Sequence, residues 1–471
     1  MSEMKSISGG SILGTADVKK LLFKFAVPSV IAMLVGALYN IVDQIFLGQS
    51  IGMLGNAATN VAFPIITIAV AFGLLFGVGG ASNFNLFIGA GNKERARVVI
   101  GNALSLLVLS GLAASVLIHF FAEPLTTLFG ATDSVFPLAY EYISIASFGL
   151  IFLIFSTGAS SIIRADGSPK YSMYCLLSGA ILNIFLAALF IFGFQWGIAG
   201  AAWATVISQF VSSMIALVYF RKMKSVSLRR DDFILKSSVV KPILYLGASS
   251  FMNQIAMLGV QVVLNNVAIF YGATSVYGSE IPLAISGIVS KVSMIFISII
   301  IGISQGGQPI AGYNYGAKNY GRVKEVFKLV IGISMVISVI SFVCFQVFPL
   351  QIIRIFGDGS DLYFEFAVRF CRIYLFMMFV IGIQPASSIL FTAIGKSSKG
   401  IFLAMIRQVV LLIPLLILLP MHYGIDGILY AGPISDAVAA GVAFTFVYLE
   451  MKKLTVLERN EKEKRQKISA V

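Results

Sequence analysis

The segment Gly89-Ala90-Gly91-Asn92-Lys93-Glu94-Arg95 recurs 227 residues later as Gly316-Ala317-Lys318-Asn319-Tyr320-Gly321-Arg322, with four identical positions. Three further matches keep the same offset, and they are Phe129-Gly130 with Phe356-Gly357, Ala159-Ser160-Ser161-Ile162 with Ala386-Ser387-Ser388-Ile389, and Gly197-Ile198 with Gly424-Ile425. Four matches in one register are typical of a duplicated unit and not of chance. The sequence therefore predicts two similar halves.

Long apolar runs fill both halves. Of the 471 residues, 58% are apolar and 12% are charged, whereas a soluble domain has about 25% charged residues. A helix needs about 20 mainly apolar residues to cross a bilayer. Twelve runs meet this length, at about 22–47, 60–88, 99–121, 137–163, 173–193, 199–220, 243–271, 282–305, 325–347, 363–392, 401–420 and 428–450. Continuous runs predict helices and not barrel strands, so we expect an all-α polytopic membrane protein with twelve transmembrane helices.

Basic residues mark one side of the predicted membrane protein. Of the 34 Lys and Arg residues, five lie within the spans and Arg354 lies opposite the termini, while the others share the side of the two termini. Cytoplasmic loops carry such an excess, so we expect both termini in the cytoplasm. Because each half has six spans, the two halves start on the same side, and the repeat is parallel about an axis along the membrane normal.

We expect five parts along the chain. They are a cytoplasmic N-terminal segment 1–20, a first six-helix bundle 21–220, a basic linker 221–241, a second six-helix bundle 242–450 and a basic cytoplasmic tail 451–471. Two similar bundles enclose a cleft, and rocking them opens it to one side and then the other, which is alternating access. The orientation explains the net charge of +13, so the expected partners are a small-molecule substrate and the lipid bilayer, and no nucleic acid.

Several classes of function are excluded by the types of residue present. The run Gly395-Lys396-Ser397 lacks the leading glycine of a phosphate-binding loop, because that position is Leu390. The two histidines, His119 and His422, are far apart in the chain, and the three cysteines lie in apolar runs. We therefore expect no cofactor, no metal cluster and no enzyme activity. Transport is expected to use an ion gradient or to be passive.

Asp43 is the first candidate for the coupling group. It shares a face of the first span with Tyr39 and Asn40, and Gln44 follows it. A buried aspartate is costly without a partner or a wet cavity. Protonation neutralises it, as a proton carrier requires, and neighbouring oxygens suit Na⁺ equally; the alternative is a solvent-wetted residue near the helix end. Pro28 in the same span is a hinge candidate or an ordinary membrane proline.

The second half carries a different set of polar residues. Gln254, Gln261 and Asn265 are seven and four residues apart, so they share one helix face. This uncharged face is expected to line a cavity or to hold helices together. Lys291 lies deep in the eighth span, where a lysine needs a partner or a cavity. The candidates for substrate contact are these four residues together with Tyr39, Asn40 and Gln44.

Two charged residues lie in the last two spans. Arg407 starts the eleventh span, and its long side chain is expected to reach the cytoplasmic interface. Asp436 lies in the twelfth span and is expected to pair with a buried cation that the sequence does not name.

Four motifs make the chain resemble the MATE (multidrug and toxic compound extrusion) transporters over essentially its whole length. They are Gln305-Gly306-Gly307-Gln308-Pro309-Ile310-Ala311-Gly312-Tyr313-Asn314-Tyr315-Gly316-Ala317, Ala165-Asp166-Gly167-Ser168-Pro169, Asn183 with Phe190-Ile191-Phe192-Gly193, and Gly197-Ile198-Ala199-Gly200-Ala201-Ala202. The resemblance implies a V-shaped pair of bundles that exports drugs in exchange for H⁺ or Na⁺. We further expect a monomer in the plasma membrane of a prokaryote.

The resemblance also implies where a coupling cation binds. In the prokaryotic branch with its cation site in the first bundle, the site uses an Asp in the first helix, an Asn and an Asp four apart in the fifth, and a Thr in the sixth. Asp43, Asn183 and Thr205 match three of these positions. The fourth is Ala187, and Ala188 replaces the proline that usually follows. One carboxylate in place of two weakens a Na⁺ site more than a one-proton site.

Three functions remain in competition. The first is an antiporter that exports amphipathic, cationic drugs or metabolites in exchange for H⁺ or Na⁺. The second is a flippase or exporter for lipid-linked or anionic substrates in the same superfamily, which would use Lys291 and Arg407. The third is a non-transporting sensor or binding partner, which is suggested by Ala187 in place of the second aspartate of the coupling site. The motif at 305–317 and the twelve spans favour the antiporter.

Overall fold

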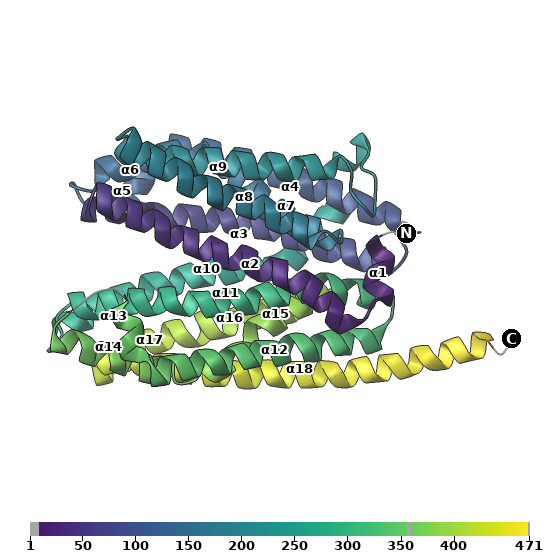
Figure 1. Cartoon of the computed structure of the whole chain (residues 1–471). Coiled ribbons are helices and arrows are strands. Elements are labelled where there is room, and N and C mark those ends of the chain that lie inside the picture. Colours follow the sequence, from purple (N-terminus) through teal and green to yellow (C-terminus); the bar gives the residue numbers. More distant parts are fainter. Residues whose placement is uncertain (1–8, 356–358, 470–471) are drawn as a thin grey trace, which may run out of the picture.

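The structure, a computed structural model, describes residues 9–355 and 359–469. Every regular element in these residues is a helix, and the helices form two bundles, one above the other in Figure 1. The first bundle contains α2 (Val18–Ser50), α3 (Met53–Gly89), α4 (Lys93–Phe120), α5 (Ala122–Leu128), α6 (Phe136–Ser147), α7 (Leu150–Ala165), α8 (Pro169–Ala188), η1 (Leu189–Gly193) and α9 (Gly197–Phe220).

The second bundle repeats this arrangement. It contains α10 (Ser237–Ala273), α11 (Glu280–Gly316), α12 (Tyr320–Val347), α13 (Pro349–Arg354), α14 (Asp361–Tyr374), η3 (Met378–Val380), α15 (Ile383–Ala393), α16 (Ser397–Met405), η4 (Ile406–Leu412), α17 (Ile413–Tyr423) and α18 (Ile425–Ser469). A short helix, η2 (Arg230–Phe233), lies in the connection between the bundles. The predicted all-α fold of two bundles is confirmed.

The fourth helix of each half is broken, which corrects the continuous runs predicted at 137–163 and 363–392. Among the described residues, ten helices are long and apolar enough to span a membrane, and the number is twelve if each of two bent pairs forms one span. The axes of α6 and α7 differ by 56°, and those of the corresponding pair in the second half by 42°. Glycine permits close packing at the first break, because a β-carbon on Gly149 would lie 3.1 Å from Val206 Cγ2, and beyond the second break, because one on Gly382 would lie 2.5 Å from Ser338 Oγ.

Both ends of the described chain lie on the same side of the molecule (Figure 1). The short helix α1 (Gly9–Thr15) is held against α11 and α12, because Asn314 and Arg322 both donate hydrogen bonds to the carbonyl oxygen of Leu13, at 2.9 and 3.1 Å. At the other terminus α18 continues as a helix into the segment predicted as a basic tail. Glu458 on this extension pairs with Lys324 of α12 at 2.6 Å.

Candidate functional site: a cavity between the two bundles

A cavity of about 380 Å³ lies between the bundles, within the range of about 300–1,000 Å³ for small-molecule sites. Helices α2, α3, α7, α8 and α9 form one wall, and α10, α11 and α15 form the other. Most of its polar side chains are uncharged, and they include Ser156, Thr157, Ser160, Asn183, Gln209, Gln254, Ser298, Gln305 and Gln308. Met33, Met257 and Met294 add polarizable apolar surface that adapts to varied ligands.

Glycines bring the bundles into contact at the end that holds the termini. A β-carbon on Gly247 of α10 would lie 1.7 Å from the carbonyl oxygen of Leu75 in α3, and one on Gly89 would lie 2.0 Å from that of Tyr313 in α11. Small residues permit such close approach of helix backbones. In Figure 1 the bundles converge at this end and diverge toward α5 and α13. The cavity is therefore closed on the side of the termini.

Asp43 belongs to a polar cluster inside the first bundle. Its Oδ1 atom is buried and has no hydrogen-bond partner among the residues that the structure describes. Tyr39, one turn earlier on α2, and Tyr142 on α6 both lie near this carboxylate. An unpaired carboxylate is costly at this depth, so the group is suited to take up a proton or a cation.

Asn183 and Thr205 complete the cluster. The Asn183 side-chain amide donates a hydrogen bond to the Thr205 hydroxyl at 3.1 Å, and that hydroxyl donates to the carbonyl oxygen of Ala201 at 3.1 Å. Tyr142 of α6 lies near both Thr205 and Asp43. Tyr142 is therefore a shared neighbour of Asp43 and of the hydrogen-bonded pair of Asn183 and Thr205.

The cluster and the cavity share two side chains. Tyr39 and Asn183 both line the cavity, although Asp43 itself does not appear in its described lining. A ligand in the cavity therefore lies close to the groups that surround the carboxylate.

Ala187 occupies the position where the resemblance implied a second aspartate. It lies one helical turn beyond Asn183 and is 1% exposed, packed within the apolar core of the first bundle. No group of three His, Cys, Asp or Glu side chains suited to a metal ion occurs among the described residues. A monovalent cation at this cluster would have the Asp43 carboxylate and neutral amide and hydroxyl oxygens as its ligands.

The structure separates the other substrate candidates. Gln254 lines the cavity, whereas Gln261 donates a hydrogen bond to Asn265 at 2.9 Å, and neither of this pair appears in the described lining. Lys291 and Gln44 also lie outside the lining. They join the two bundles through a 2.8 Å hydrogen bond from the lysine ammonium to Gln44 Oε1.

The remaining two candidates of the first span, Asn40 and Pro28, lie on α2. The side chain of Asn40 lies outside the described residues. Pro28 lies inside α2, which continues as one helix from Val18 to Ser50.

Three functional candidates were missed in the sequence. Arg164 lines the cavity, is 3% exposed and donates to Ser161 Oγ at 3.4 Å. Gln305 of α11, in the opposite wall, has a buried side-chain oxygen that is unpaired within the described chain. The spacing of three residues between Gln305 and Gln308, at the start of the 305–317 motif, could have identified Gln305. The position of Arg164 before the loop at 166–168 suggested only a cytoplasmic anchor. Tyr142 gave no signal beyond its place in an apolar run.

Arg407 does not reach the cytoplasmic interface, which corrects the expectation for this residue. It lies in the π-helical turn η4, and its Nε atom pairs with Asp436 Oδ1 of α18 at 2.5 Å. The side chains are 15% and 3% exposed. The buried cation expected for Asp436 is therefore Arg407, and the pair is part of the interior of the second bundle.

Comparisons with known proteins agree with this architecture. The MatE family model matches residues 28–189 and 247–418. The multidrug export protein MepA of Staphylococcus aureus (strain MSSA476) is 27% identical over 449 residues, which cover 94% of this chain and 96% of that protein. MepA of Staphylococcus saprophyticus is 28% identical over 453 residues, with the same coverage.

A solved structure gives the same result for the fold. It is described as an outward-facing conformation of a multidrug resistance MATE family transporter of the MOP superfamily, and it is 25% identical to this chain. The TM-score is 0.88, and the alignment covers 96% of this chain and 99% of that one.

Proposed function

The chain belongs to the MatE family, and we propose that it exports amphipathic, cationic drugs or metabolites in exchange for H⁺ or Na⁺. Its relatives are transporters, so the chain is not an enzyme. The family and the twelve spans make it a multi-pass membrane protein. The excess of Lys and Arg on the side of the termini supports a cytoplasmic location for both ends. We infer a monomer in the plasma membrane of a prokaryote.

One observation carries the coupling mechanism: the buried, unpartnered oxygen of Asp43 lies in a cluster that shares Tyr39 and Asn183 with the central cavity. A proton or Na⁺ that binds here neutralises the carboxylate. Because Tyr39 and Asn183 belong both to the cluster and to the cavity lining, we expect binding at one site to change the affinity of the other site, and such coupling is reciprocal. In an antiporter, binding of the ion must lower the affinity for the substrate, and binding of the substrate must lower the affinity for the ion.

The arrangement favours H⁺ over Na⁺ as the coupling ion. A proton needs one carboxylate oxygen, whereas Na⁺ needs several oxygen ligands. Ala187 supplies a methyl group where a second carboxylate would stand. We therefore propose Asp43 as the proton-binding group, with Asn183 and Thr205 as positioning residues.

The closed end of the cavity supports an outward-open resting state. With the termini in the cytoplasm, the contacts of Gly247 with Leu75 and of Gly89 with Tyr313 form the cytoplasmic seal. Export then proceeds when the two bundles separate at this seal, admit the substrate from the cytoplasm and reopen outward.

Arg164 favours an alternative substrate class. It is a charged residue in the described lining, and it would attract an anionic group. Lys291 and Arg407, named for this role from the sequence, do not line the cavity, so an anion exporter would depend on Arg164.

The test is transport by the purified full-length chain in proteoliposomes. Ethidium serves as the cationic probe and carboxyfluorescein as the anionic probe, with a proton gradient and a Na⁺ gradient imposed separately. We expect ethidium accumulation under the proton gradient, abolished by a protonophore. Accumulation under Na⁺ alone would transfer the coupling to Na⁺. Transport of carboxyfluorescein alone would show that the substrates are anionic and not cationic. Binding of a probe without flux under either gradient would indicate a sensor.

A further inference from the structure

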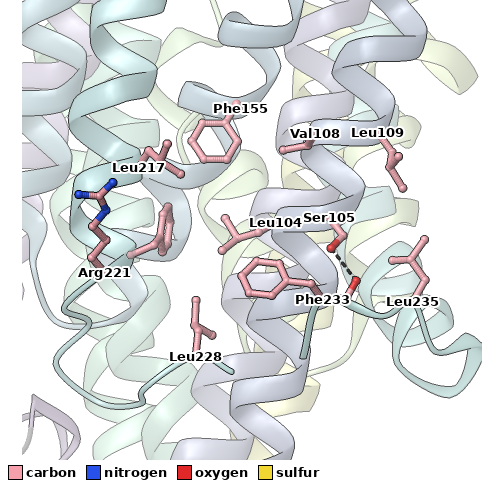
Figure 2. A pocket seen from close by; sticks show the side chains of 11 residues that line it. Leu104, Ser105, Val108, Leu109, Phe155, Leu217, Arg221, Leu228, Phe233 and Leu235 are labelled. Atoms are coloured by element: carbon pink, nitrogen blue, oxygen red, sulfur yellow. Dashed lines mark hydrogen bonds between the residues drawn. The ribbon is translucent and has the colours of Figure 1, made fainter. Parts of the chain in front are cut away.

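A second pocket, of about 580 Å³, lies on the outside of the first bundle at the end that holds the termini. Figure 2 shows its walls, formed by α4, α7 and α9, and its floor, formed by the connection between the bundles. It is lined by Leu104, Ser105, Val108, Leu109, Phe155, Leu217, Phe220, Arg221, Leu228, Phe233 and Leu235. None of these residues lines the central cavity. The pocket is therefore a separate site.

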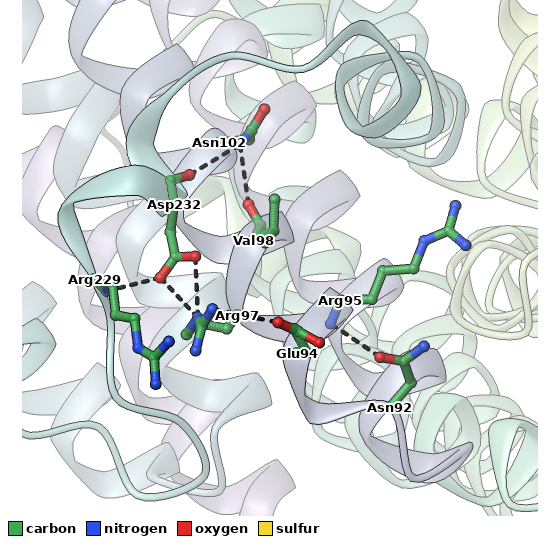
Figure 3. Close-up of polar contacts among 8 residues, drawn as sticks. All are labelled: Asn92, Glu94, Arg95, Arg97, Val98, Asn102, Arg229 and Asp232. Carbon is green, nitrogen blue, oxygen red and sulfur yellow. Dashed lines mark hydrogen bonds and ion pairs between the residues drawn. The ribbon is translucent and has the colours of Figure 1, made fainter.

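The connection that closes this pocket is fixed in place by buried contacts. Asn102 of α4 is fully buried, and its side-chain amide donates to the carbonyl oxygen of Asp232 at 2.9 Å (Figure 3). The same amide donates to the carbonyl oxygen of Ile234 at 3.0 Å. Its oxygen accepts the backbone N–H of Lys236 at 2.8 Å. Arg97 pairs with Asp232 at 2.9 Å. These contacts hold the connection, and with it the floor of the pocket, in a defined position against α4.

Gly101 of α4 permits the backbone of the connection to approach α4 closely. A β-carbon there would lie 2.3 Å from the carbonyl oxygen of Asp232. Ser105 adds a hydrogen bond to the carbonyl oxygen of Phe233 at 2.8 Å, which is drawn in Figure 2. These contacts position the ring of Phe233 at the pocket.

The rim of the pocket is apolar and exposed. It carries exposed apolar side chains, with Leu109 at 52%, Leu217 at 44% and Phe233 at 43% exposure. On the surface of a membrane-spanning bundle such side chains contact acyl chains. The pocket is large enough and apolar enough to hold part of one chain.

Positive charge lies at the edge of this apolar surface. Arg221 is exposed, and its guanidinium forms no hydrogen bond or ion pair within the described residues. The connection 221–241 contains seven Lys and Arg residues and two acidic residues, and one of these two, Asp232, is already paired with Arg97. Guanidinium groups bind phosphate oxygens in a planar, bidentate geometry.

We propose that this pocket binds an acidic phospholipid of the leaflet on the side of the termini, with an acyl chain against Leu104 and Val108 and the phosphodiester at Arg221. An apolar groove beside an unpaired guanidinium matches both halves of such a lipid. A zwitterionic lipid has the same chains without the net charge. One basic residue near a bilayer surface favours the acidic lipid about fivefold.

The test uses tryptophan quenching by brominated lipid in proteoliposomes of the full-length chain. The two native tryptophans are replaced (Trp196→Phe, Trp203→Phe), and Phe233→Trp places a reporter in the pocket. All vesicles contain equal phosphatidylglycerol and phosphatidylcholine, and the bromine is carried by one lipid or the other, so that the surface charge stays constant. A second reporter, Phe185→Trp, lies on an exposed ring of α8 that is 70% exposed and outside the pocket.

We expect brominated phosphatidylglycerol to half-quench the reporter at position 233 at about fivefold lower mole fraction than brominated phosphatidylcholine. The reporter at position 185 should show no preference. Arg221→Gln should remove the preference at position 233, Arg221→Lys should retain it, and Arg230→Gln, an exposed neighbour outside the lining, should leave it unchanged. Equal quenching by both lipids, or a preference that persists in Arg221→Gln, would overturn the proposal. Neither result depends on whether the chain transports drugs.

Discussion

The side-chain amide of Asn183 on α8 donates a 3.1 Å hydrogen bond to the hydroxyl of Thr205 on α9. The two residues are 22 positions apart, on neighbouring helices joined by a π-helical turn. Asn183 is 3% exposed, so its amide has little access to water. This contact fixes the packing of the two helices beside Asp43.

A double-mutant cycle measures this contact. Asn183→Leu and Thr205→Val should each lower the free energy of unfolding in detergent, because each leaves the other polar group without its partner. We expect a coupling energy of about 0.6 kcal/mol, with an upper value of about 1.7, as for other hydrogen bonds between membrane helices. Thr205→Ser, which keeps the hydroxyl, is the control and should preserve the coupling. A coupling of zero would remove the pair from the positioning role.

Asp43→Asn tests the coupling group. The amide has nearly the shape of the carboxylate but cannot change its charge by binding a proton. We expect uptake of ethidium to fall to the rate seen without any gradient, while binding of ethidium to the detergent-solubilised protein persists. Asp133→Asn is the matched control, because Asp133 is exposed in a loop, and it should transport normally. Gradient-driven uptake by Asp43→Asn would exclude this residue as the coupling group.

Ala187→Asp tests the preference for protons. A carboxylate one turn from Asn183 would add a ligand for Na⁺, and we expect Na⁺ affinity to increase about tenfold, equivalent to roughly 1.4 kcal/mol. Because Na⁺ would bind only the folded state, the melting temperature of this variant should rise with NaCl but not with KCl. Ala188→Asp places the same charge one residue away and should show no such difference. Equal responses to both salts in Ala187→Asp would mean that the cluster does not accept Na⁺.

Gly247→Ala tests the seal at the end of the termini. Its β-carbon would lie 1.7 Å from the carbonyl oxygen of Leu75, so α3 and α10 cannot approach as closely. Spin labels at Lys93→Cys and Lys318→Cys, in a chain with its three native cysteines replaced, report the separation of the bundles at this end. We expect a longer mean distance in Gly247→Ala, and no change in Gly441→Ala, where nothing lies within 4 Å of the added carbon. An unchanged distance would exclude this contact as the seal.

The architecture could be predicted from the sequence because hydropathy and the 227-residue repeat record it directly. Run length reports how much apolar chain is present but not its direction, so the bends between α6 and α7 and in the corresponding pair were not predicted. Helical spacing groups residues on one face without identifying what that face meets. Gln254 therefore reached the cavity, whereas Gln261 and Asn265 bond to each other.

Asp43 was predicted from its place in an apolar span, whereas Asn183 and Thr205 were named only by the resemblance. Tyr142 lies about 100 positions from Asp43 in the chain, and only the packing of α6 against α9 brings it to the cluster. The contacts of Arg164 and Lys291 likewise depend on tertiary packing that the sequence does not give. The sequence placed Lys291 deep in the membrane, but the tilt of α2 against α11 decides that it meets Gln44.

The buried pair of Arg407 and Asp436 gives the largest predicted change in stability. Asp436→Asn leaves an uncompensated guanidinium in the second bundle, since Arg407 Nε lies 2.5 Å from Asp436 Oδ1 and the carboxylate side chain is 3% exposed. Breaking such a pair costs about 3–5 kcal/mol, which should appear as a large fall in the free energy of unfolding. Arg407→Met with Asp436→Leu removes both charges and should be more stable than Asp436→Asn.

Glu463→Gln is the control, because its pair with Arg459 is exposed at 54% and 81% and contributes at most about 1 kcal/mol. A double variant no more stable than Asp436→Asn would show that the pair contributes more through its hydrogen bond and packing than it costs in desolvation.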